Sequence, residues 1–278
     1  MLDAHQHFWE VARRDHEWVS PEYPALFDDF GPDQLAPLMK EAGVTGTVLV
    51  QAAETEDETD YLLGIAARTD FILGVVGWLD MLAPDFGERL DHYRGKPKWV
   101  GLRPMLQAHE PTVIADPRFR DALRIVAQRD VPFDILTFPR HLPATIEALR
   151  ATPGVHGIVD HISKPDMTGP LDGEWCAAIE VLAAMPNIHC KISGLPTEAG
   201  ADWTADRIRP FVEFIAHAFG PKRLVFGSDW PVCRLAASYG QVVGLAKDIL
   251  GRLYGPEDMQ AIMETNGKAF YRLGGAGA

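Results

Sequence analysis

The sequence has few of the features that mark several common protein classes. Its three cysteines, Cys176, Cys190 and Cys233, are odd in number and lack C-x-x-C spacing. This excludes a disulfide framework and fits a reducing compartment. No apolar run approaches the roughly 18 residues of a membrane-spanning helix. Asp3 and His5 interrupt the start before the apolar region of a secretory signal could form. We therefore expect a cytoplasmic protein with no membrane partner.

Basic residues and glycine motifs are also scarce. The chain carries 26 Lys and Arg residues against 39 Asp and Glu residues, which gives a formal net charge of -13. Nucleic acids bind to clustered cations, so they are excluded as partners. No G-x-G-x-x-G or G-x-x-x-x-G-K-[ST] loop is present to hold nucleotide phosphates. No G-x-S-x-G turn supports a serine nucleophile.

What the chain does contain is a regular alternation of short apolar strands and amphipathic helices. The predicted strands cover residues 2–7, 45–52, 71–79, 99–105, 131–138, 157–162, 188–193 and 223–230. The predicted helices cover residues 33–41, 61–68, 86–93, 118–129, 143–150, 175–184, 207–219, 241–250 and 258–273. Eight such units over 278 residues predict a single (β/α)8 TIM barrel spanning residues 1–278. The long segment 8–32 is predicted to be a functional loop or a lid.

Two histidines stand one residue apart near the start of the chain. His5 and His7 share one face of a strand, because side chains alternate with period two. That spacing suits chelation of one divalent cation, but it is also found in surface histidines at a loose terminus. The rest of the sequence has to decide between these readings.

A (β/α)8 barrel places its active site at the carboxyl ends of its strands. Reading those ends in order, we find a restricted set of polar and aromatic residues: His5, His7, Gln51, Trp78, Asp80, Arg103, Asp134, Thr137, Asp160, His161, Lys164, Lys191, Ser193, Ser228, Asp229 and Trp230. From this set we select His161, Asp229 and Arg103 as catalytic residues. We select Trp78, Asp134, Lys164 and Trp230 as substrate-binding residues.

Each selected residue also has a purely structural interpretation. His161 would be a hydrogen-bonded core histidine, Asp229 a turn cap, and Arg103 a partner for an acid on the barrel rim. Asp134 would belong to an ion pair inside the barrel, and Lys164 would be a solvated loop cation. The two tryptophans would be core residues rather than the walls of a pocket.

The ordered combination resembles the amidohydrolase superfamily, and within it the amidohydrolase-2 branch of sugar-lactone and 2-pyrone-4,6-dicarboxylate lactonases. The matching segments are His5-Gln-His7, Val100-Gly-Leu-Arg103, Val159-Asp-His-Ile-Ser-Lys-Pro165, Lys191-Ile-Ser-Gly194 and Leu224-Val-Phe-Gly-Ser-Asp-Trp-Pro231. The resemblance implies the barrel fold and at most one divalent metal, most simply zinc, on His5, His7 and Asp229. Lys98 lies at the wrong end of its strand to bridge a second metal, and some lactonases of this branch need none.

The resemblance also implies lactone hydrolysis, with Asp229 as the base that activates water. Arg103, protonated His161 or a metal would stabilise the oxyanion. The favoured substrate is a sugar-acid lactone, such as L-fuconolactone or L-rhamnonolactone. The alternatives are an anionic lactone such as 2-pyrone-4,6-dicarboxylate, metal-dependent decarboxylation, or a barrel that only binds its ligand.

Overall fold

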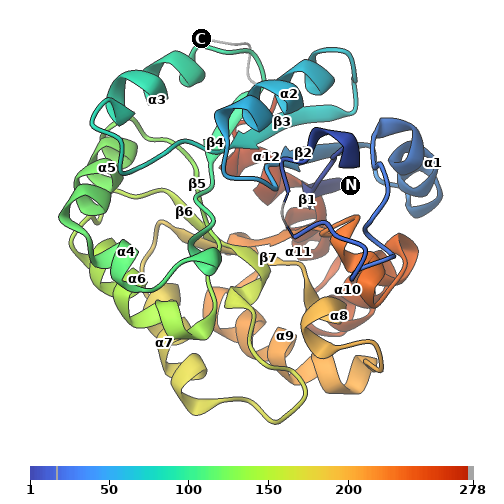
Figure 1. The fold of residues 1–278 in the computed structure, drawn as a ribbon. Coiled ribbons are helices and arrows are strands. Elements are labelled where there is room, and N and C mark those ends of the chain that lie inside the picture. Colours follow the sequence, from blue (N-terminus) through green and yellow to red (C-terminus); the bar gives the residue numbers. More distant parts are fainter. Residues whose placement is uncertain (17, 275–278) are drawn as a thin grey trace.

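Eight parallel strands form one sheet in the order of the sequence, from β1 to β8. The computed structural model describes residues 1–16 and 18–274. The strands are β1 (Leu2–Gln6), β2 (Gly46–Val50), β3 (Ile72–Gly77), β4 (Trp99–Leu102), β5 (Phe133–Ile135), β6 (Gly157–Val159), β7 (Ile188–Ile192) and β8 (Leu224–Phe226). In Figure 1 the strands occupy the centre and the helices surround them. The predicted (β/α)8 barrel is confirmed.

Closure of the barrel depends on backbone contacts just beyond β8. The amide of Asp229 donates to the carbonyl of His5 at 2.8 Å, and the amide of His7 donates to the carbonyl of Trp230 at 2.7 Å. The last strand thus joins the first at the end where the predicted site residues lie.

The helices lie between the strands along the chain and on the outside of the sheet (Figure 1). They are α1 (Pro32–Ala42), α2 (Glu56–Ala67), α3 (Phe86–Arg94), α4 (Thr112–Ala115), α5 (Pro117–Gln128), α6 (Leu142–Arg150), α7 (Gly173–Ala183), α8 (Leu195–Ala199), α9 (Ala205–Phe219), α10 (Tyr239–Leu253), α11 (Pro256–Gln260) and α12 (Asn266–Phe270). The Asp116 carboxylate caps α5 by accepting from the amide of Arg118, as Asp-Pro at a helix start predicts.

Several helices differ from their predicted extents for local reasons. Helix α2 begins at Glu56, because Thr55 caps it, so the acidic turn lies inside the helix. The predicted helix 258–273 is interrupted by a π-helical segment, Ala261–Thr265. The short helices α4 and α8 were not predicted, since four or five residues show too little periodicity.

The barrel interior is apolar at its amino end. Leu2 and Ala4 of β1 pack with valines of β2 and β3 and with Phe270 and Tyr271 at the end of α12. The pairing of β1 with β2 is irregular between Asp3 and Gln6. A register irregularity of this kind re-aims side chains, and His5 also reaches the interior.

Candidate active site

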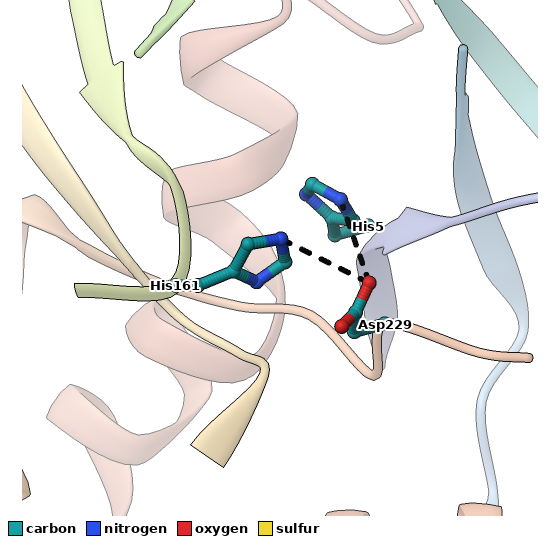
Figure 2. A group of neighbouring side chains, drawn as sticks. All are labelled: His5, His161 and Asp229. Carbon is teal, nitrogen blue, oxygen red and sulfur yellow. Dashed lines mark ion pairs between the residues drawn. The ribbon is translucent and has the colours of Figure 1, made fainter. Parts of the chain in front are cut away.

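Asp229 is the centre of the site at the carboxyl end of the barrel. Its Oδ1 lies 3.3 Å from Nε2 of His7, 3.8 Å from Nε2 of His161 and 3.9 Å from Nε2 of His5. Figure 2 shows the His5 and His161 rings directed at this carboxylate. The structure therefore brings four of the predicted site residues together from the ends of β1, β6 and β8.

A buried carboxylate on β1 fixes the backbone around Asp229. Asp3 accepts hydrogen bonds from the Ser228 amide at 2.8 Å, the Ser228 hydroxyl at 2.6 Å and the Tyr239 hydroxyl at 3.1 Å. Burial raises the pKa of Asp3 to about 6, against the opposing effect of these donors. Asp229 itself has a φ of 59°, which is unusual for a residue with a side chain. The Asp3 contacts hold the turn that presents it.

His161 begins a run of four residues in the left-handed region. The φ values of His161, Ile162, Ser163 and Lys164 are 50°, 49°, 59° and 49°. Such a conformation costs about 1–2 kcal/mol per residue for L-amino acids. The run is held by Trp175, whose indole N–H donates to the carbonyl of Ile162 at 3.0 Å, and by a bond between the Ser163 and Thr137 hydroxyls at 3.0 Å.

The ring of His161 lies against the start of α8. Its Nδ1 is 2.9 Å from the hydroxyl of Ser193. A methyl group added to Gly194 would stand 2.8 Å from the same nitrogen, so only glycine leaves room for the ring. Burial lowers the pKa of His161 well below its usual value, so this side chain is neutral near neutral pH. The protonated His161 that we expected to stabilise an oxyanion is therefore disfavoured.

A charged cluster fills the barrel below the site. The Lys191 ammonium lies 2.5 Å from Oδ2 of Asp134, 3.0 Å from Oδ1 of Asp160 and 3.0 Å from Nδ1 of His5, and all four side chains are fully buried. The Tyr271 hydroxyl donates to Asp134 at 2.8 Å. Asp134 was predicted to bind substrate, which was wrong: its oxygens are taken by Lys191 and Tyr271, beneath the site.

Arg103 links this cluster to the cavity. Its Nη1 lies 3.2 Å from Nε2 of His5 and 3.3 Å from Oδ2 of Asp160, and its Nη2 donates to the carbonyl of Gln51. Burial first, and Lys191 and Arg103 with it, lower the pKa of His5 well below its usual value. Burial alone would raise the pKa of Asp229, but His161 and His7 outweigh it and hold that pKa below its usual value.

A cavity of about 290 Å³ opens above these residues. Its polar side consists of His7, Arg103, Gln107, His161, Lys164, Thr197 and Asp229. Its apolar side consists of Trp18, Tyr23, Leu26, Ala52, Met105, Leu136, Val232 and Leu235. Three of these apolar residues come from the segment 8–32, which therefore forms a wall of the cavity. A small ligand with one polar and one apolar face would fit it.

The substrate-binding predictions for the two tryptophans and Lys164 have different outcomes. Lys164 lines the cavity, and its ammonium lies 3.3 Å from a carboxylate oxygen of Glu198. Trp230 is buried against Phe8 and Phe30 and lies outside the cavity wall. Trp78 is half-buried and is also absent from the wall formed by the described residues. Neither tryptophan therefore lines the cavity that holds Asp229.

The donor set around Asp229 fits one divalent ion. Nδ1 of His7 is 2.8 Å from the carbonyl of Val50, so it carries the proton and Nε2 has a free lone pair facing Asp229. Two lone pairs 3.3 Å apart call for a shared proton or a cation between them. Tetrahedral zinc sets its ligand atoms about 3.3–3.6 Å apart. The distances from Asp229 to His161 and His5 are a few tenths of an ångström longer, and the three residues whose ligand atoms all lie within 4.8 Å of one another are His5, His161 and Asp229.

A second cluster with metal-ligand spacing, formed by His5, Asp134 and Asp160, already holds a cation. The Lys191 ammonium lies within 3.0 Å of an atom of each. The chain's own lysine therefore occupies this position.

Lys191 and Glu198 are the site residues that sequence reasoning failed to assign. Lys191 is among the strand-end residues of the sequence, but its long side chain points into the barrel, where its ammonium contacts Asp134 and Asp160, and not toward the cavity. Glu198 lies in the unpredicted helix α8, for which Pro196 at the helix start was the available signal.

Comparison with known proteins gives full-length matches. A family model described as amidohydrolase matches residues 2–273. An L-fucono-1,5-lactonase of Burkholderia ambifaria is 40% identical over 98% of this chain and 95% of its own length. Another L-fucono-1,5-lactonase, of Burkholderia multivorans, is 38% identical over 88% of this chain and 87% of its own.

Solved structures agree. A crystal structure of an amidohydrolase from Burkholderia multivorans with bound zinc has a TM-score of 0.92 and 34% identity, covering 98% of this chain and 99% of the other. A crystal structure from Acinetobacter baumannii, described as that of a probable 2-pyrone-4,6-dicarboxylic acid hydrolase, shares the fold at 16% identity, with a TM-score of 0.82 over 98% and 99% of the two chains. Barrel, site and matches lead to one conclusion: the chain belongs to the amidohydrolase family.

Proposed function

We propose that this protein hydrolyses a sugar-acid lactone to the open-chain acid. The observation that carries the proposal is the placement of Asp229, a carboxylate beside three histidine rings and one guanidinium at the floor of a small cavity. A carboxylate in that position is suited to activating water. The two L-fucono-1,5-lactonases that resemble this chain over most of its length support an aldonolactone of the L-fucono type.

In this mechanism Asp229 takes a proton from a water molecule as the water oxygen bonds to the lactone carbonyl carbon. Arg103, which lines the cavity, stabilises the oxyanion that forms on the carbonyl oxygen. Neutral His161 supplies at most one N–H for the same purpose. When the bond between the carbonyl carbon and the ring oxygen breaks, protonated Asp229 returns its proton to the departing alkoxide. The product is a hydroxy acid.

We propose that His161 and Asp229, with a histidine of the His5 and His7 pair, can hold one divalent ion, most simply zinc, and that hydrolysis does not depend on it. When bound, such an ion would polarise the lactone carbonyl. The orientation of water by Asp229 and the charge of Arg103 remain available without it. The proposal is supported by the bound zinc in one similar amidohydrolase structure and by the metal-ligand spacing of His5, His161 and Asp229.

The charges in the cavity favour a neutral lactone over a dicarboxylate. Arg103 and Lys164 are the cations in the cavity wall, and Glu198 already pairs with Lys164. Recognition of two carboxylates usually requires several unpaired Arg or Lys side chains. We therefore favour a neutral aldonolactone over 2-pyrone-4,6-dicarboxylate as the substrate.

The described residues contain no helix long and apolar enough to cross a membrane. We propose a cytoplasmic location.

The proposal is tested by acid release from a panel of aldonolactones and 2-pyrone-4,6-dicarboxylate. We expect turnover of L-fuconolactone and a loss of about 10³-fold or more in kcat for Asp229→Asn, which keeps the shape but cannot accept a proton. Asp202→Asn, a surface carboxylate, is the matched control. Turnover of the dicarboxylate alone, or near-normal rates for Asp229→Asn, would refute the proposal.

A further inference from the structure

One contact bears directly on how the site treats a metal ion. Nη1 of Arg103 lies 3.2 Å from Nε2 of His5. The same Nε2 faces Oδ1 of Asp229 at 3.9 Å, on the side where an ion would sit. A guanidinium has N–H donors and no acceptor, so the contact uses the lone pair of Nε2. A metal bound to His5 would need that same lone pair.

The other nitrogen of His5 offers no alternative. Nδ1 lies 3.0 Å from the Lys191 ammonium and 3.4 Å from Oδ1 of Asp160. A neutral imidazole carries one proton and one lone pair. Both ring nitrogens of His5 therefore face a cation of the chain itself, and a metal on Nε2 would need the lone pair at the nitrogen that the Arg103 guanidinium already contacts at 3.2 Å.

Arg103 is also fixed in this position. It is 2% exposed, its Nη2 donates to the Gln51 carbonyl, and its backbone carbonyl accepts from the Gln51 side chain at 2.7 Å. A cation displaced from a buried position loses its partners and is costly to leave unpaired. Displacing the guanidinium from Nε2 of His5 therefore costs free energy.

We propose that Arg103 is the resident cation at His5 and competes with a divalent metal for it. In the protein with Arg103 in place, an ion keeps His161 and Asp229 of the group that has metal-ligand spacing, but not His5. His5 joins as a further ligand only when the guanidinium leaves. Arg103 thereby weakens metal binding by occupying a ligand, in addition to the repulsion that any nearby cation exerts.

The test is zinc binding to chelator-stripped protein without substrate, measured by competition with a chromophoric chelator. We expect Arg103→Met and the polar variant Arg103→Gln to bind zinc about tenfold or more tightly, the scale of outer-shell effects on metal affinity. Lys164→Met removes the same charge from the same cavity without touching His5, and we expect a change several times smaller. Circular dichroism establishes that each variant is folded.

A double-mutant cycle separates competition from repulsion. In a His5→Gln background, loss of Arg103 should give no larger gain in zinc affinity than loss of Lys164 gives. Unchanged or weaker zinc binding in both Arg103 variants would overturn the proposal. An equal gain with and without His5 would also overturn it. Since no lactone is involved, either result is independent of whether the proposed hydrolysis holds.

Discussion

Gly194 is the residue on which the position of His161 most directly depends. Gly194→Ala would place a methyl group 2.8 Å from Nδ1 of His161 and would also strain a backbone with a φ of 68°. We expect kcat to fall about tenfold or more through displacement of the ring. We expect a loss of about 1 kcal/mol in the free energy of unfolding from the backbone. Steady-state kinetics and urea unfolding measure the two effects.

The control is Gly220→Ala. Gly220 has the same φ of 68° but nothing within 4 Å of an added methyl group. It should lose similar stability and keep its activity. If both variants lost activity alike, the contact with His161 would not be the cause.

Lys191 allows a second prediction at the level of single residues. Lys191→Met leaves Asp134 and Asp160 buried without their shared cation, and removing one partner of a buried pair costs about 3–5 kcal/mol. We expect a loss of unfolding free energy of that size. Lys96→Met, which breaks the more exposed pair with Asp60, should cost about 1 kcal/mol or less. Similar losses of unfolding free energy in the two variants would show that the buried cluster stabilises the fold no more than an exposed ion pair does.

Among the elements, the segment 8–32, which forms a wall of the cavity, is hydrogen-bonded to Glu58 of α2 and to the loop after β2. The buried Glu58 of α2 accepts from Nε2 of His16 at 2.9 Å and from the amides of Ala52 and Ala53 at 2.9 Å each. The Trp18 indole donates to the carbonyl of Ala52 at 3.0 Å. The wall of the cavity and the loop after β2 are thus held together by the Glu58 carboxylate and by the Trp18 indole.

Glu58→Gln replaces one of these acceptor oxygens with an N–H donor. An unsatisfied buried group costs about 1–3 kcal/mol, so the segment should open more often. We expect faster hydrogen exchange in residues 18–27 and a KM raised severalfold. Glu56→Gln, which alters a carboxylate of the same helix paired with Arg89, should leave both unchanged. Unchanged exchange in Glu58→Gln would refute the fastening role.

The left-handed run that carries His161 shows what sequence patterns cannot reveal at this scale. Val-Asp-His-Ile predicts a strand to residue 162, but β6 ends at Val159. The reversal depends on Trp175 and Thr137, which are distant in the chain. A β-branched Ile162 in this conformation is contrary to local preference, so only the tertiary contacts explain it.

For the whole molecule, the ionisation of the site predicts a broad pH profile. Asp229 acts as a carboxylate, so activity is complete above its pKa and is lost as the pH falls through it. Although burial alone would raise that pKa, His161 and His7 keep it below its usual value. Burial lowers the pKa of His161 well below its usual value, so His161 also becomes protonated only at acidic pH.

In metal-free enzyme with His7 replaced by Gln, which removes the other ring in contact with Asp229, we therefore expect kcat/KM to show no limb near about pH 6.5, the usual value for histidine. Initial rates from about pH 5.5 to 8, corrected for spontaneous lactone hydrolysis, measure this. A clear limb near the usual value would mean that a histidine titrates in the working site.

The barrel as a whole was predictable because eight alternating units leave few other topologies. Strand ends likewise located His5, His7, Arg103, His161 and Asp229, since parallel strands bring their carboxyl ends together. Direction within the barrel was not predictable. Asp134 lies within β5 and Lys164 follows β6, yet one side chain points into the charged cluster and the other into the cavity.

The charged cluster reaches from His5 through Lys191 and Asp134 to Tyr271, beyond the last helix at the opposite end of the barrel. TIM barrels are usually treated as two independent faces, one for chemistry and one for stability. In this protein, grafting new loops onto the carboxyl face and trimming the chain before residue 271 would both disturb the same charged cluster. Redesign or evolutionary exchange in this protein therefore has to treat both ends of the barrel together.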